Sequence, residues 1–186
     1  VTSGGQGCIF EPAIRCKGKS PTRPSRRKTS SKTRKIISKV MFHEKSAKRE
    51  FQMNDRVREI PGHEDWAILW ETLCDTPEYR KISQTSDIQT CLQKKHLKPT
   101  PQQSYPMLVG PFGGDTLHSY GLGIWTKKAL QTQTAFDKAW GTLWNLLENM
   151  FFALTQLQEY DQTRMAHADI TVRNVLVKDS QTYLID

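Results

Sequence analysis

Near its end the chain reads H-A-D-I-T-V-R-N-V-L-V over residues 167–177 and, after a short apolar stretch, I-D at residues 185–186. Asn174 and Asp186 supply side-chain oxygens, the ligand type that Mg²⁺ prefers, and Asp169 supplies a carboxylate that could accept a proton. The spacing between Asp169 and Asn174 is long enough for a loop that turns back on itself, so that both side chains face one site. The alternative is a polar loop between a helix and a β-hairpin, in which these side chains only satisfy the backbone of a turn.

The positive charge of the chain is concentrated in one segment. The 186 residues carry a net charge of +8, and they are enough for one domain with a sizeable core or for two small lobes. Residues 17–35 hold five lysines, four arginines and no acidic residue, so this segment alone carries +9 and the remainder −1. Its Ser, Thr and Pro content predicts a loop that buries no apolar surface. The segment could contact an anionic partner, such as nucleic acid or an acidic protein, or be a solvated insertion.

Cysteine spacing and hydropathy bear on the redox environment of the protein and on whether it crosses a membrane. The four cysteines form no C-x-x-C pair and have no histidine at zinc-finger spacing, so we expect neither a zinc site nor a disulfide framework. A reducing, intracellular environment follows as the default. No apolar run reaches the roughly 18 residues of a membrane span, so no transmembrane segment is expected. The chain starts without Met and stops directly after an apolar stretch, and we expect it to be part of a longer polypeptide.

The first residues predict a glycine-rich turn between two strands. Gly4, Gly5 and Gly7 precede the apolar residues Ile9 and Phe10. Glycine permits positive φ angles and lets backbone N–H groups approach phosphate oxygens closely. An ordinary hairpin turn is the alternative interpretation.

The next two elements offer a possible ion pair. Residues 36–42 predict a strand in which Lys39 points either to solvent or to a phosphate. Residues 44–60 carry a partial apolar stripe of helical spacing, and Pro61-Gly62 ends it. Glu50 on this helix is the first candidate to pair with Lys39, and Glu59 is the second.

The middle of the chain predicts two more strands and a linker. Residues 65–74 are expected to be a strand because Trp66, Ile68 and Trp70 alternate. A polar connection with a short helix over residues 88–95 leads to a second strand over residues 105–109. The sequence G-P-F-G-G at residues 110–114 then predicts a linker with an accessible backbone.

The strongest periodic pattern predicts a long helix over residues 136–160. Its width and its two tryptophans favour a core helix of a globular lobe over a coiled coil. Two short strands, at residues 174–177 and 183–185, follow the H-A-D stretch and are joined by a polar turn. The apolar positions of the helix step by four and three residues: Phe136, Trp140, Leu143, Leu147, Met150, Leu154 and Leu157.

In this order the chain resembles the protein kinase superfamily. Three stretches of sequence are similar to those of the divergent serine/threonine kinases of large nucleocytoplasmic DNA viruses. They read G-G-Q-G-C-I-F-E-P-A-I-R-C, I-S-K-V and F-G-G-D-T-L. The resemblance implies an α+β fold with a small antiparallel-sheet N-lobe over residues 1–109, including the basic insertion. It further implies a hinge at residues 110–114 and, over residues 115–186, the start of a mainly helical C-lobe that stops at a metal-binding Asp.

The resemblance also implies roles for individual residues, with ATP and Mg²⁺ as cofactors. Gly4, Gly5 and Gly7 would cover the ATP phosphates, and Lys39, held by Glu50, would contact the α- and β-phosphates. Adenine would bond to the hinge backbone near Pro111 and Gly113. Asp169 would be the catalytic base, and Asn174 and Asp186 would bind Mg²⁺.

Two departures from the family pattern bear on activity. Ala168 stands where the family usually has Arg, and Thr171 where it often has Lys. Without the rest of a C-lobe, the 186 residues are expected to be inactive in isolation. A protein substrate and location in the host cytoplasm or the virion are implied if the viral resemblance holds. The alternative is a pseudokinase or virion structural protein that keeps the fold for contacts with other virion proteins.

Overall fold

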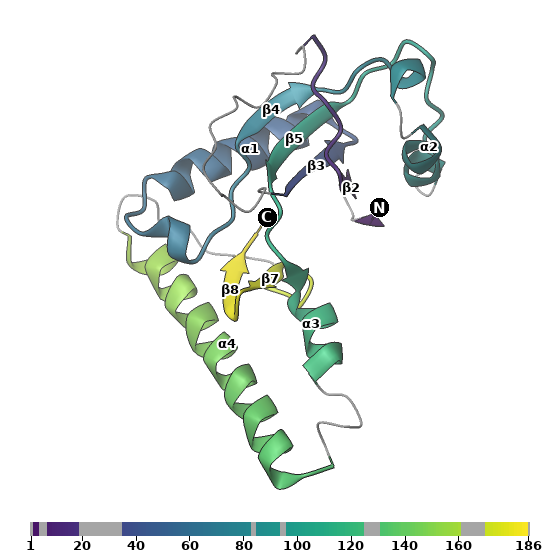
Figure 1. The fold of residues 1–186 in the computed structure, drawn as a ribbon. Coiled ribbons are helices and arrows are strands. Elements are labelled where there is room, and N and C mark those ends of the chain that lie inside the picture. The colour runs from purple at the N-terminus through teal and green to yellow at the C-terminus, as the bar shows by residue number, and fades with distance from the viewer. Residues whose placement is uncertain are drawn as a thin grey trace, which may run out of the picture. The chain divides into compact units, whose positions relative to one another are not determined.

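The computed structural model describes residues 2–3, 7–18, 35–82, 85–93, 96–124, 131–160 and 170–185 (Figure 1). The fold is α+β, with a five-stranded and a three-stranded antiparallel sheet and four described α-helices. The chain divides into two compact units. Unit 1 comprises residues 1–52 and 70–112, and unit 2 comprises residues 53–69 and 113–186.

The sheet of unit 1 has the strand order β1-β2-β3-β5-β4. Its neighbouring strands are all antiparallel, and in the middle of the sheet Ile9, Lys39 and Leu108 lie opposite one another. A short 3₁₀ turn, η2 (Tyr79–Lys81), lies on the connection between β4 and β5. The strand bounds are β1 (Thr2–Ser3), β2 (Gly7–Phe10), β3 (Ile36–Met41), β4 (Thr72–Asp75) and β5 (Pro106–Pro111).

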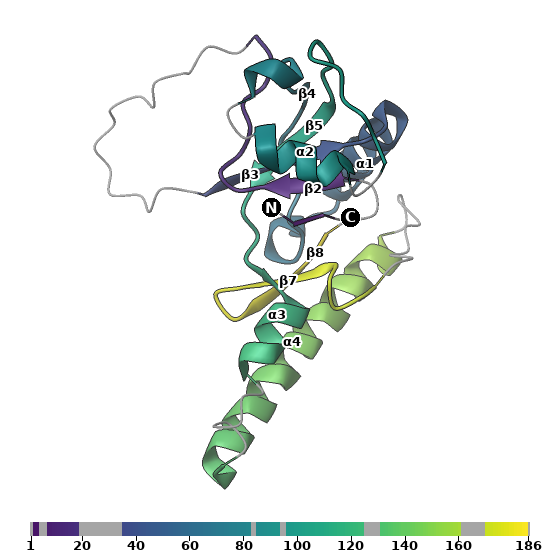
Figure 2. The same cartoon turned by 90° about the vertical axis from the view of Figure 1, so that its right-hand side faces the viewer.

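Two helices cover opposite faces of this sheet (Figures 1 and 2). Successive strand residues point to opposite faces, so Val40 and Met41 of β3 enter different cores. Val40 packs in a cluster with Ile88 and Leu92 of α2 (Thr85–Gln93). Met41 packs with Ala47 of α1 (Glu44–Arg58). The face against α1 is the one that concerns the candidate site.

Unit 2 combines a small sheet of order β6-β7-β8 with helices α3 (Leu117–Ile124) and α4 (Gln133–Glu159). The strands are β6 (Asp115–Thr116), β7 (Val175–Lys178) and β8 (Gln181–Leu184). Asp179 and Ser180 both have positive φ, at 51° and 65°, which is typical of the two-residue turn of a β-hairpin. The hairpin of residues 174–185 is therefore present as predicted, whereas α3 was not predicted.

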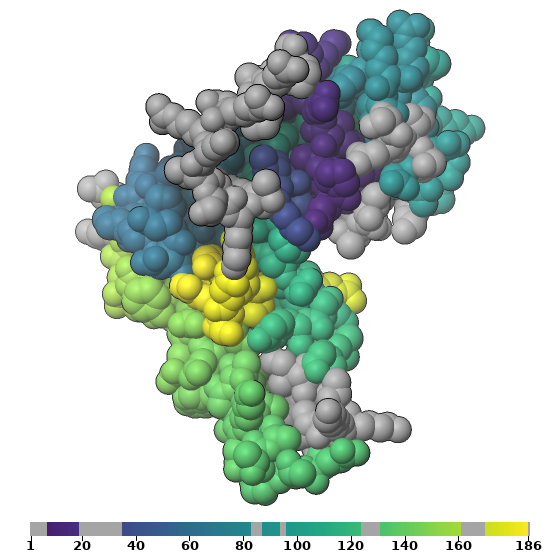
Figure 3. Space-filling model, in the orientation of Figure 1, coloured from purple at the N-terminus to yellow at the C-terminus, as the bar shows by residue number. Residues whose placement is uncertain are grey.

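Only part of the apolar face of α4 is buried. The helix begins after Thr132, whose hydroxyl oxygen accepts a hydrogen bond from the Ala135 N–H, and it agrees with the predicted range within a few residues. Its buried positions are Ala139, Leu146, Ala153 and Leu157. The prediction of a broad buried face was wrong, because much of α4 lies on the surface (Figure 3). The exposed aromatic side chains are Phe136, Trp140, Trp144, Phe151 and Phe152.

The strand predicted over residues 65–74 is largely absent. A 3₁₀ turn, η1 (His63–Asp65), comes first, and Ala67 makes only an isolated parallel bridge to Leu184. Regular strand begins at Thr72 with β4. The alternation of Trp66, Ile68 and Trp70 misled the prediction, because Trp66 and Ile68 belong to unit 2 and Trp70 to unit 1, and the two tryptophans pack in different cores. Conversely, Gly110 and Pro111 extend β5 into the predicted linker.

All four cysteines lie in disulfide bonds, which corrects the expectation that no disulfides form. Cys8 of β2 is joined to Cys91 of α2, and Cys16 is joined to Cys74 of β4. The paired residues are 83 and 58 positions apart, so no local spacing reveals the partners. Both bridges lie in unit 1. They weaken the argument for a reducing environment, because disulfides persist mainly where conditions are oxidising.

The basic segment is described only at its two ends, and residues 19–34 lie outside the described part. The Lys17 N–H donates a hydrogen bond to the Asp75 carbonyl oxygen at 2.8 Å. Lys35 forms an ion pair with Glu11 at 3.0 Å, and its Nζ lies 5.2 Å from the centre of the Phe112 ring. None of the helices described here has the length and apolar character needed to cross a membrane.

Candidate functional site

A buried ion pair joins the centre of the unit 1 sheet to α1. The Lys39 Nζ lies 2.8 Å from Glu50 Oε1 and 3.0 Å from Oε2, so the ammonium group donates to both carboxylate oxygens. The Lys39 side chain is 9% exposed and that of Glu50 is 12% exposed. The pairing predicted between these two residues is thus present, and Glu50 rather than Glu59 is the partner.

The local fold explains why these two residues meet. Lys39 lies on β3, which has β2 on one side and β5 on the other. Glu50 lies almost two turns into α1, whose Ala47 and Phe51 pack against Met41 and Leu108 of the sheet. These apolar contacts hold the glutamate on the face toward which the lysine points. An ion pair so far removed from water costs desolvation energy, which good geometry must offset.

Trp70 is the third member of the cluster, and the sequence did not predict it as a site residue. Its indole Nε1–H donates a hydrogen bond of 2.7 Å to Glu50 Oε1, the oxygen that also accepts from Lys39. The Lys39 Nζ lies 6.0 Å from the centre of the Trp70 ring. In the sequence, Trp70 looked like an ordinary core residue of a strand. Its hydrogen-bond partner is 20 positions away, and no periodic pattern reveals a contact of that kind.

The arrangement is suited to binding an anion. A lysine ammonium that is held in one orientation and mostly shielded from water interacts strongly with a phosphate oxygen, because screening by solvent is weak. The two contacts with the Glu50 carboxylate hold the Lys39 ammonium in place. ATP therefore fits the chemistry of Lys39, one of the described residues to which the resemblance assigns the phosphates.

Gly7 has a structural reason to be glycine. It pairs with Met41 in the sheet, and a Cβ at this position would lie 2.5 Å from the Val40 carbonyl oxygen. A side chain would therefore disrupt the pairing of β2 with β3. The β3 backbone occupies the space that a side chain at Gly7 would need.

The predicted hinge residues lie on either side of the boundary between the units. Pro111 ends β5 opposite Ile36, in unit 1. Gly113 is buried in unit 2, where an added Cβ would collide with side-chain atoms of Leu176 and Ile68. Gly114 has a φ of 98°, and its Cβ would collide with the Val177 carbonyl oxygen. This close packing explains why the two residues, which follow β5 closely, are both glycine.

In unit 2 the β7–β8 hairpin brings Asn174 next to Ile185. The Ile185 N–H donates a hydrogen bond of 3.2 Å to the Asn174 carbonyl oxygen, and the Asn174 N–H donates one of 2.9 Å to the Thr171 carbonyl oxygen. The hairpin register, in which Val175 faces Leu184, accounts for this placement. Asn174 is therefore adjacent to the residue that precedes Asp186.

Four predicted site residues, Gly4, Gly5, Asp169 and Asp186, lie outside the described residues. Within the described ranges no three His, Cys, Asp or Glu side chains gather into a group that could hold a metal ion. The Mg²⁺ site expected at Asn174 and Asp186 needs one residue from beyond those ranges.

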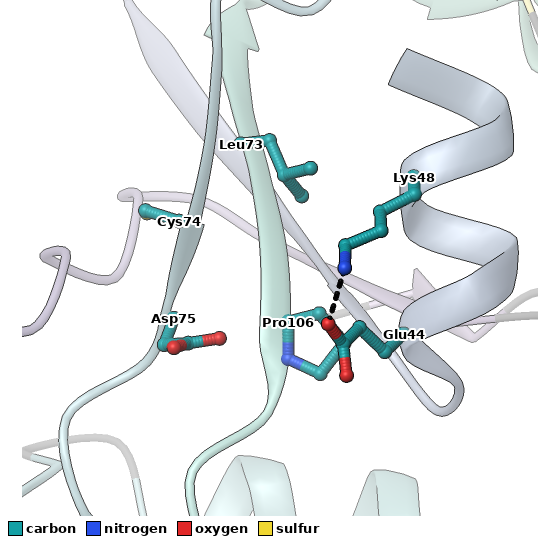
Figure 4. Close-up of a pocket in the computed structure, with 6 residues that line it drawn as sticks. All are labelled: Glu44, Lys48, Leu73, Cys74, Asp75 and Pro106. Atoms are coloured by element: carbon teal, nitrogen blue, oxygen red, sulfur yellow. Dashed lines mark ion pairs between the residues drawn. The ribbon is translucent and has the colours of Figure 1, made fainter. Parts of the chain in front are cut away.

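A shallow pocket lies elsewhere on unit 1, between the first turns of α1 and the strands β4 and β5 (Figure 4). Its volume of 230 Å³ is below the roughly 300–1,000 Å³ of typical small-molecule sites. Glu44 and Lys48 form an ion pair of 2.7 Å on the α1 side of the pocket, and Asp75 lies on β4 opposite them. The hydrogen bond from Lys48, and after it the Lys48 charge, lower the pKa of the Glu44 carboxyl. None of the predicted site residues lines this pocket.

In comparisons with known proteins, no protein-family model and no curated protein sequence matches the chain.

Proposed function

We propose that the chain is the nucleotide-binding part of an ATP-dependent protein kinase that transfers the γ-phosphoryl group to a serine or threonine hydroxyl. The observation that carries the proposal is the ion pair of Lys39 with Glu50, buried between a central strand and the helix that packs on it. An α+β architecture with a small antiparallel sheet is compatible with it.

In the proposed reaction ATP supplies the phosphoryl group, and the residues of the chain bind and orient. Lys39 would bind the α- and β-phosphates and Glu50 would hold it in place. Asn174 and Asp186 would provide oxygen ligands for Mg²⁺. Asp169 would orient the substrate hydroxyl and accept its proton as that oxygen bonds to the γ-phosphorus and the bond to the β-phosphate oxygen breaks. Positioning and charge neutralisation provide most of the rate enhancement in such a reaction.

The basic segment belongs to the proposal as an accessory site for an anionic partner. Its charge of +9 over residues 17–35 would attract nucleic acid or an acidic protein surface. Binding through such a segment falls steeply with salt concentration, and deleting residues 19–34 should abolish it.

The decisive test is Mg²⁺-dependent binding of ATP to the full-length protein, measured by calorimetry. Lys39→Met should weaken binding at least tenfold, and Asp186→Asn should remove its dependence on Mg²⁺. Lys48→Met is the matched control, because Lys48 also pairs with a glutamate of α1 but is 60% exposed. It should bind ATP as the wild type does. Circular dichroism must show that each variant is folded.

Absence of binding at millimolar ATP, in protein shown to be folded, would contradict the proposed function. Equal losses in Lys39→Met and Lys48→Met would also contradict it, because they would indicate a general effect of charge.

A further inference from the structure

The indole N–H of Trp70 shares an oxygen with the lysine. Glu50 Oε1 accepts from Trp70 Nε1 at 2.7 Å and from Lys39 Nζ at 2.8 Å, while Oε2 accepts from Lys39 at 3.0 Å. A lysine side chain is flexible, so its contact alone leaves a carboxylate some freedom to rotate about its side-chain torsions. A donor on a rigid ring removes that freedom, because the indole N–H points in one direction from a packed side chain.

The Trp70 ring is itself held by its neighbours. It packs against the cluster of Met41, Ala47 and Leu108, together with Phe51 and Leu73. That cluster joins β3, β4, β5 and α1. The ring therefore transmits the position of the sheet to the carboxylate on the helix, independently of the lysine.

We infer that Trp70 is a positioning residue, whose indole N–H holds the Glu50 carboxylate where it fixes the Lys39 ammonium. The inference deepens the proposed function and rests on it for its effect on nucleotide binding. The loss of a hydrogen bond to a charged group changes an equilibrium constant by about tenfold. Trp70 would thus tune the affinity of Lys39 for phosphate without touching the nucleotide.

Trp66 provides a matched control in the same chain. It is 2% exposed and packs in the core of unit 2, and its Nε1 is a buried nitrogen with no hydrogen-bond partner within the described structure. Trp66→Phe and Trp70→Phe make the same chemical change, the loss of an indole N–H with retention of an aromatic ring. Only the second removes a bond to the candidate site.

The experiment measures MgATP affinity and the indole ¹⁵N–¹H spectrum of the full-length protein. Trp70→Phe should weaken MgATP binding about tenfold and Trp66→Phe should leave it unchanged. In a Glu50→Ala background, Trp70→Phe should have no further effect, because the residue acts through Glu50. The indole proton signal assigned to Trp70 should move upfield in Glu50→Ala, as expected for loss of a bond to a carboxylate.

Unchanged affinity in Trp70→Phe, or an equal loss in the Glu50→Ala background, would overturn the inference. The spectrum separates its failure from that of the proposed function. If the wild type binds no nucleotide, the proposed function fails, and the Trp70 indole signal alone decides whether the residue holds Glu50. A signal that stays in place in Glu50→Ala would overturn the inference in that case too.

Discussion

The two units hold their elements together in different ways. Unit 1 uses specific links, namely two disulfide bonds and the cluster of Lys39, Glu50 and Trp70. The described core of unit 2 depends on apolar packing around a narrow stripe of α4, while large aromatic side chains of the same helix remain exposed. A periodic pattern of hydrophobic residues therefore indicates a helix in either unit. The pattern does not tell which of these hydrophobic side chains the folded unit buries.

The largest effect should come from the covalent links of unit 1. Reducing both disulfides should lower the free energy of unfolding of this unit by about 4 kcal/mol per bridge, because each closes a long loop in the unfolded chain. Urea denaturation with and without reductant, compared with a Cys8→Ala/Cys91→Ala variant, measures the effect. An unchanged midpoint on complete reduction would show that the bridges do not stabilise unit 1.

A core truncation in unit 2 should come next. Leu146 is 1% exposed, and Leu146→Ala should cost about 2–5 kcal/mol of unfolding free energy through lost burial and the cavity left behind. Leu122→Ala is the matched control, because Leu122 on α3 is 67% exposed and its truncation should change stability by less than about 0.5 kcal/mol. Similar losses in both variants would contradict the distinction between buried and exposed leucines in this unit.

The exposed aromatic residues of α4 should contribute little to folding. Trp140 and Phe151 are 53% and 60% exposed, so Trp140→Gln and Phe151→Gln should each change the unfolding free energy by less than about 0.5 kcal/mol. Thermal denaturation of the two variants checks this. A loss comparable to that of Leu146→Ala would mean that these side chains are covered in the folded protein.

The smallest effect concerns the exposed Glu44–Lys48 pair, in contrast to the buried Lys39–Glu50 pair. Lys48 lowers the pKa of Glu44, so this carboxylate contributes stability above its unfolded pKa, and the contribution is lost as the pH falls through the lowered folded value. NMR titration should therefore find the Glu44 pKa below the usual value of a glutamate, moving back toward that value in Lys48→Met. An identical pKa in both proteins would contradict the pairing.

Local sequence predicted those parts of the fold that depend on neighbours along the chain. The helix bearing Glu50, the strand bearing Lys39 and the hairpin after Asn174 follow from short periodic patterns and turn residues. The pairing of Lys39 with Glu50 could be predicted because only 11 positions separate them. The short strand predicted around Trp66 and Trp70 was wrong, because alternation over so few residues also arises where the chain passes from one core to another.

The sequence by itself determined most of the element types, the order of the candidate motifs and the local concentration of charge, because these depend on residues close together in the chain. Only the tertiary structure decided that Cys8 meets Cys91, that Trp70 donates to Glu50, and that α4 buries Leu146 rather than its tryptophans. Each of these contacts depends on which surfaces the sheets and helices present to one another. Packing selects among side chains that are equally apolar in the sequence, and it brings together partners that no spacing reveals.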